Sequence, residues 1–166
     1  MRIDDYFTSL ERSLRREAGV SKIEEPVVFL ASDDYNGLIR CRVVFWDESF
    51  LDLYEVVSTE LGYPVRIHYS YTYIREGKRA FRYDNAPHHP EIATHPYHKH
   101  IGSQDRLAPA DQPTLKQILD EVEEWLEHRQ GNEEHRMTLS KNPGTSRTKK
   151  AVLRAVIFLN LLRQSL

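Results

Sequence analysis

The residues best suited to chemistry are five histidines between Phe81 and Gly102. They are His88, His89, His95, His98 and His100. An imidazole titrates near neutral pH, can donate or accept a proton, and is the commonest side chain to bind a metal ion. Because Asp84, Asn85, Lys99 and three prolines lie in the same stretch, we expect a catalytic or metal-binding loop there.

One reaction that suits these residue types is metal-independent cleavage of RNA. It needs a general base for the ribose 2′-hydroxyl, a general acid for the leaving 5′-oxygen, and cations or hydrogen-bond donors at the phosphate. Two of the histidines with Lys99, Arg82 and Tyr97 could fill these roles, and Asp84 could orient an imidazole or raise its pKa. Further phosphate-binding charge could come from Arg75, Lys78 and Arg79 at the rim of the loop.

A metal site is the second interpretation. His95, His98 and His100 have ligand-like spacing, Asp84 could add an oxygen, and a bound zinc or manganese ion would activate water. The sequence has no His-Glu-x-x-His motif, and its one cysteine excludes a cysteine-rich zinc site. A third interpretation is purely structural, because His-Pro and Asn-Ala-Pro segments are good loop formers.

The elements that must hold this loop precede it. Apolar residues spaced three and four apart from Ile3 to Leu14 predict an amphipathic helix that ends near Gly19. Alternating and β-branched runs then predict about five short strands, at 27–30, 38–46, 50–57, 65–75 and 80–84. The first two are joined by a turn with Asn36-Gly37 chemistry, and tight turns throughout favour an antiparallel meander. The tyrosines of the fourth strand are interpreted as a core layer.

A second helix and a distinct C-terminal segment follow the loop. The apolar stripe from Leu115 to Leu126 predicts a helix that ends at Gly131-Asn132. Residues 136–166 form a basic connector and a strongly apolar helix, which could pack on the domain, cover a neighbouring subunit or receive a partner. We interpret this segment as an interaction arm. We therefore expect an α+β domain at 1–135, and oligomerisation through residues 150–166.

Composition sets the remaining limits. A chain of 166 residues has room for one domain with a real core. Its formal net charge of −2 gives no global attraction to nucleic acid or to a membrane, and the lone Cys41 fits a reducing compartment. We find neither an apolar signal segment nor a membrane span, and expect a cytoplasmic protein.

Two motifs carry a family resemblance. Tyr83-Asp-Asn-Ala-Pro-His-His-Pro90 followed by His95-Pro-Tyr-His-Lys-His100 resembles the TumE family of toxins from prokaryotic toxin–antitoxin modules. The resemblance covers roughly residues 25–128. It implies a growth-arresting protein neutralised by a TumA-like antitoxin of the helix-turn-helix type, and ribonuclease activity follows only by analogy with other small toxins.

The resemblance also implies the site residues. It points to Tyr83, Asp84, Asn85, His88, His89, His98, Lys99 and His100, whereas Tyr97 stands where the family commonly has a histidine. We assign His88 and His98 to the acid/base pair and Asp84 to its orientation. The catalytic set is His88, His98, Asp84, Lys99 and His100, and the substrate-binding set is Arg79, Arg82, Tyr83, Asn85, His89 and Tyr97. The rival hypothesis is a non-catalytic module that binds nucleic acid or protein through the loop.

Overall fold

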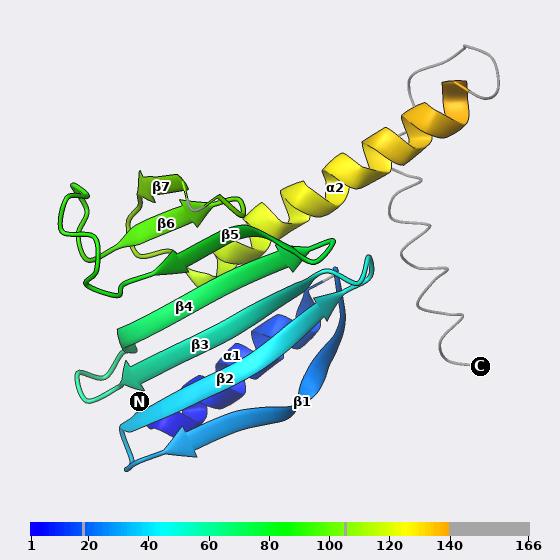
Figure 1. Ribbon diagram of the computed structural model, residues 1–166. Coiled ribbons are helices and arrows are strands. Elements are labelled where there is room, and N and C mark those ends of the chain that lie inside the picture. The colour runs from blue at the N-terminus through cyan, green and yellow to red at the C-terminus, as the bar shows by residue number, and fades with distance from the viewer. Residues whose placement is uncertain (18, 105, 140–166) are drawn as a thin grey trace, which may run out of the picture. The chain divides into compact units, whose positions relative to one another are not determined.

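The computed structural model describes residues 1–17, 19–104 and 106–139, without the side chains of residues 25, 26, 28 and 128–139. The elements are α1 (Ile3–Arg16), β1 (Val20–Ala31), β2 (Asn36–Phe45), β3 (Phe50–Ser58), β4 (Val65–Arg75), β5 (Lys78–Asp84), β6 (His98–Ile101), β7 (Arg106–Pro109) and α2 (Leu115–Leu139) (Figure 1). Residues Met1–Leu126 form one compact unit, and Glu127–Leu166 form a second.

The strands form one sheet in the order β1-β2-β3-β4-β5-β6-β7, and every neighbouring pair is antiparallel. This confirms the antiparallel meander and the α+β class. The expectation of about five strands is wrong, because β6 and β7 extend the sheet beyond β5. Each of the two has only four residues, too few to show an alternating pattern, and β7 ends in proline.

The first hairpin also differs from the expectation. Strand β1 begins at Val20 and runs through Pro26, where its register against β2 shifts between Glu24 and Val28. A proline is tolerated at such a bulge on an edge strand because the ladder is locally interrupted. Asn36 and Gly37 lie within β2 and not in the turn, since Asp33 Oδ1 accepts the backbone N–H groups of residues 35 and 36 and closes the turn before them.

The core lies against one face of the sheet. Alternate residues of β2, β3 and β4 are buried on this face, including Tyr71 and Tyr73, so the tyrosines of β4 form part of the core. Ile3, Phe7, Leu10 and Leu14 of α1 and the apolar residues of α2 up to Leu126 join the same cluster. Helix α1 and the part of α2 up to Leu126 lie behind the sheet in Figure 1.

The helix ends differ from those expected. Helix α1 ends at Arg16, because Glu17 has extended backbone angles. Helix α2 passes Gly131-Asn132 and continues to Leu139. The predicted apolar arm at 150–166 lies outside the described residues. Within the described part of the chain, neither helix is long and apolar enough to cross a membrane.

Candidate functional site

Strand β6 places two histidines on the face of the sheet that the helices leave uncovered. Side chains alternate along a strand, so His98 and His100 share one face and Lys99 takes the other. On the neighbouring strand β5, Asp84 pairs with His98 and Arg82 pairs with His100. Residues 98–101 are therefore a strand, and the expectation of a loop continuing to Gly102 is wrong at this point.

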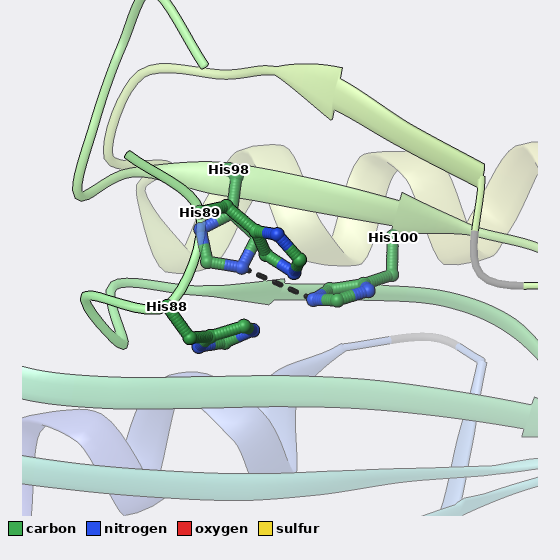
Figure 2. A group of neighbouring side chains, drawn as sticks. All are labelled: His88, His89, His98 and His100. Carbon is green, nitrogen blue, oxygen red and sulfur yellow. Dashed lines mark hydrogen bonds between the residues drawn. The ribbon is translucent and has the colours of Figure 1, made fainter. Parts of the chain in front are cut away.

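The connection from β5 to β6 brings His88 and His89 to the same place. The ring centroids of His88, His89, His98 and His100 lie between 4.2 and 5.9 Å apart in all six pairings. Each ring has a nitrogen within 4.8 Å of one on every other ring. Figure 2 shows the two rings of β6 beside the two rings of the loop. We call these four residues the histidine cluster.

The hydrogen bonds of His98 define its tautomer. Its Nδ1 lies 2.9 Å from the carbonyl oxygen of Pro96, which can only accept, so Nδ1 is the donor. In the neutral ring Nε2 then carries a lone pair. That atom lies 3.1 Å from His100 Nε2, which donates to it when both rings are neutral (Figure 2). Both rings are buried, with exposures of 1% for His98 and 5% for His100.

Asp84 is a buried carboxylate beside both rings. It is 1% exposed, its Oδ1 lies 3.3 Å from His98 Nε2, and its Oδ2 lies 3.4 Å from His100 Nε2. Oδ1 also accepts the Ala86 N–H at 3.0 Å. Arg82 Nε lies 2.8 Å from Oδ2, yet the two atoms do not meet the angular requirement of a hydrogen bond. The charge of Asp84 is thus balanced by ion pairing, while Oδ2 has no hydrogen-bond donor among the described residues.

The two loop histidines differ from those of β6 because they reach solvent. His88 is exposed and His89 is half-buried. Partial desolvation and the neighbouring His89 lower the pKa of His88, and Asp84 acts in the opposite direction. His89 Nδ1 lies 3.1 Å from Glu91 Oε1 and donates to this carboxylate, so the neutral ring keeps its lone pair on Nε2.

Two predicted site residues face away from the cluster. Lys99 lies on the core side of β6, where its ammonium group is 2.7 and 2.8 Å from the two carboxylate oxygens of Glu121 in α2. Tyr83 lies beside it, and its hydroxyl donates to Glu121 Oε2 at 2.8 Å. The structure therefore brings Lys99 and Tyr83 together with each other, and not with the histidines.

The other predicted residues lie at the margins of the site. Asn85 is buried and extends the pairing of β4, because its side chain accepts the Tyr69 N–H and donates to the Ile67 carbonyl. Tyr97 stacks on Tyr69, with ring centroids 6.5 Å apart. Arg79 donates to the carbonyl of Gly102 at the far end of β5. His95 is exposed and is not among the four clustered histidines.

Sequence reasoning missed three groups that position the site. Glu91 holds the His89 ring, the Pro96 carbonyl holds His98, and Glu121 holds Lys99. The two-residue spacing from His89 to Glu91 was a usable signal for a carboxylate–imidazole pair. A backbone carbonyl leaves no mark in the sequence, and Glu121 is one of many acidic residues on its helix.

Comparison with known proteins gives the family. The family model described as toxin TumE matches residues 11–130, well over half of the chain. No match is found among the curated proteins or among the solved structures. The matched segment contains β1–β7, the histidine cluster and the Asp84 carboxylate. The chain therefore belongs to the toxin TumE family and is a toxin of a toxin–antitoxin module.

Proposed function

We propose that this toxin cleaves RNA and that the histidine cluster is its active site. The observation that carries the proposal is the meeting of four imidazoles and a buried carboxylate at one place, with two of the rings open to solvent. Such a set provides proton donors and acceptors next to a surface that a polynucleotide can reach, as general acid–base cleavage requires.

The burial of the residues divides their roles. His88 is exposed, so it is the ring that can take the proton of the ribose 2′-hydroxyl, and the leaving 5′-oxygen takes its proton from solvent water at this open edge. Arg82 is one-third exposed and its guanidinium lies at the rim of the cluster, where it can contact the phosphate. His98 and Asp84 are too buried to touch a polynucleotide. We therefore assign them to positioning, in place of the direct acid role that the sequence favoured for His98.

The partner and the domain organisation are also proposals. The toxin–antitoxin assignment supports a cognate antitoxin, and we propose one of the TumA-like helix-turn-helix type acting on a cytoplasmic toxin. We retain residues 1–135 as the toxin domain and 136–166 as an arm that mediates oligomerisation. Light scattering that shows an unchanged mass after removal of residues 144–166 would refute the oligomerisation role.

The direct test is cleavage of total cellular RNA by the purified full-length protein. We expect the wild type to cleave and His88→Ala to lose at least about 100-fold in rate, which is the ordinary contribution of a general acid or base. His68→Ala is the matched control, because His68 is an exposed histidine of β4 that is not among the four clustered histidines. No cleavage by the wild type, or equal rates for the two variants, would refute the proposal.

A second candidate is binding of nucleic acid without catalysis. The observation in its favour is a row of side chains across the uncovered face of the sheet. Each residue of this row is paired with the next on the neighbouring strand, in the order His98, Asp84, Ser70, Tyr54 and Arg40. Aromatic and cationic side chains on an open sheet are typical of single-strand binding. It predicts that the protein binds RNA and leaves it intact.

A further inference from the structure

The spacing of the polar atoms around Asp84 is that of ligands on a single metal ion. Two nitrogens bound to one zinc ion at about 2.0–2.1 Å lie about 3.0 Å apart at a right angle and about 3.4 Å apart at the tetrahedral angle. The Nε2 atoms of His98 and His100 are 3.1 Å apart, and the Asp84 oxygens lie 3.3 and 3.4 Å from them.

The hydrogen bonds outside the cluster have the arrangement that metal-binding histidines need. A metal-binding imidazole usually donates its other ring N–H to a carbonyl or carboxylate, which fixes the ring and leaves the second nitrogen bare. His98 donates Nδ1–H to the Pro96 carbonyl, and His89 donates Nδ1–H to Glu91. Both rings therefore direct their hydrogen-bonding protons away from Nε2.

The carboxylate has the capacity to complete the set. Oδ1 accepts one amide hydrogen and keeps a second lone pair, while the buried Oδ2 has no hydrogen-bond donor in the described part of the chain. Arg82 pairs with this buried carboxylate, but its Nε makes no hydrogen bond to Oδ2. A divalent ion between Asp84 and the rings would bind the carboxylate oxygen that lacks a hydrogen bond. It would also replace the proton that His98 Nε2 and His100 Nε2 share in their hydrogen bond.

We propose that this site binds one divalent transition-metal ion of the zinc class through Nε2 of His98 and His100, an oxygen of Asp84, and His89. Imidazole suits zinc and its neighbours in the first transition row, whereas magnesium and calcium prefer oxygen ligands. The set differs from the one that spacing suggested, because His89 takes the place of His95. His88 stays at the exposed edge, free for a substrate.

This inference extends the proposed function, since the ion would place positive charge next to the phosphate that His88 acts on. It does not depend on cleavage, because metal binding is measured by itself. Binding also couples to folding wherever the unfolded chain lacks the site. Zinc should therefore raise the unfolding temperature of the metal-free protein.

The first experiment is titration of full-length protein, stripped of metal by a chelator, with Co²⁺ and then Zn²⁺. We expect one equivalent of Co²⁺ to bind with the visible absorption of a nitrogen- and oxygen-coordinated ion, and Zn²⁺ to displace it. The absence of saturable binding of either ion would overturn the proposal.

Variants locate the ion. His89→Ala changes a half-buried loop residue, and Glu91→Gln keeps the shape of the group that orients His89. We expect each to lower the affinity for Zn²⁺ by at least about tenfold, the lower bound for loss of an outer-shell partner. His68→Ala should bind as the wild type does. If His89→Ala, Glu91→Gln and the ligand variant Asp84→Asn all retain wild-type affinity, the ion binds elsewhere and the proposal fails.

An RNA assay on the same samples separates this inference from the proposed function. Binding of one equivalent of zinc by a protein that never cleaves RNA would keep the metal site and refute the ribonuclease. Cleavage that is equal with and without chelator, in a protein with no saturable metal binding, would refute the metal site and keep the ribonuclease.

Discussion

Lys99 and Glu121 form a two-contact ion pair between β6 and α2, on the opposite side of the strand from His98 and His100. Although burial of the ammonium group opposes its charge, the hydrogen bond and charge of Glu121 raise the pKa of Lys99. The lysine also lies 4.8 Å from the centroid of the Tyr83 ring. The alternating direction of strand side chains thus makes Lys99 an anchor for α2 and places it on the opposite face from its histidine neighbours.

The first prediction is that Lys99→Met lowers stability and leaves RNA cleavage unchanged. The change leaves the half-buried Glu121 carboxylate without its cation, and a hydrogen bond to a charged group contributes about 1.5–3 kcal/mol before screening by solvent. We therefore expect a loss of about 1–2 kcal/mol in the free energy of unfolding by urea. Lys116→Met is the control, because the Lys116–Asp120 pair is exposed on the same helix and should give no measurable change.

Abolished cleavage by a stably folded Lys99→Met protein would contradict this assignment. It would return the lysine to the catalytic set that its place in the motif suggests.

The second prediction concerns Glu55, a carboxylate that is 1% exposed in the core. The hydroxyl of Tyr6 from α1 donates to one of its oxygens, and the hydroxyl of Tyr71 from β4 donates to the other. Tyr6→Phe removes one donor from a buried charge, so we expect a loss of about 1.5–3 kcal/mol in the free energy of unfolding. Chemical denaturation measures it. Tyr35→Phe should have little effect because Tyr35 is 46% exposed, and equal stabilities of the two variants would rule out a stabilising role for the Tyr6 bond.

The third prediction is a loss of stability in alkali. Burial raises the pKa of the Cys41 thiol from 9.0 to about 12 and that of the Tyr73 phenol from 10.0 to about 12. Burial also raises the pKa values of Tyr69 and Tyr71. At a pH above the pKa values of the unfolded chain, the unfolded chain loses protons that the folded chain keeps. The free energy of unfolding therefore keeps its full value below about pH 9 and declines as the pH rises.

Urea denaturation at a series of pH values between about 8 and 11 measures this decline. Cys41→Ala should make this decline shallower near pH 9, where the thiol of the unfolded chain titrates. This effect is separate from any change that the substitution causes in stability at neutral pH. A free energy of unfolding that stays constant over this range would show that these groups titrate alike in the folded and unfolded chain.

Prediction of this fold from sequence succeeded where a repeated pattern had enough residues to be visible. Strand β4 has eleven residues, and its alternation placed both of its ends correctly and assigned its tyrosines to the core. Strand β6 has four, and the His-Lys-His-Ile pattern was interpreted as a loop. This one omission explains the misplaced Lys99, because only a strand puts His98 and His100 on one face and Lys99 on the other.

The sequence predicted the types of residue in the site, but it did not predict which histidines come together. The density of histidines located it, and Asp84 was included because it ends β5 beside them. Whether His89 or His95 joins the group depends on the path of the loop, which is held by local bonds such as that from Thr94 Oγ1 to the Tyr97 carbonyl. Neither residue carries a pattern that distinguishes it.

The final prediction is that RNA lies across the uncovered face of the sheet on its way to the cluster. Tyr54 is half-buried on this face, one ladder position from Ser70 and two from Asp84, and the exposed Arg40 is its partner on β2. Stacking of a base on an aromatic ring contributes about 1–3 kcal/mol, so Tyr54→Ala should weaken binding of a single-stranded RNA by about 5- to 150-fold. Arg40→Ala should reduce the slope of log affinity against log salt by about one, as loss of one phosphate contact does.

Fluorescence anisotropy in the His88→Ala background measures this affinity without cleavage of the probe. Tyr63→Ala is the control, because Tyr63 is exposed outside the strands. If Tyr54→Ala binds as tightly as that control, RNA does not cross this face. Among the described residues, no hydrogen bond or ion pair joins Tyr54 to His88 or to the metal ligands. Such a result would therefore leave the proposed chemistry of the histidine cluster unchanged. It would require only that RNA reach the cluster from the side of the β5–β6 loop.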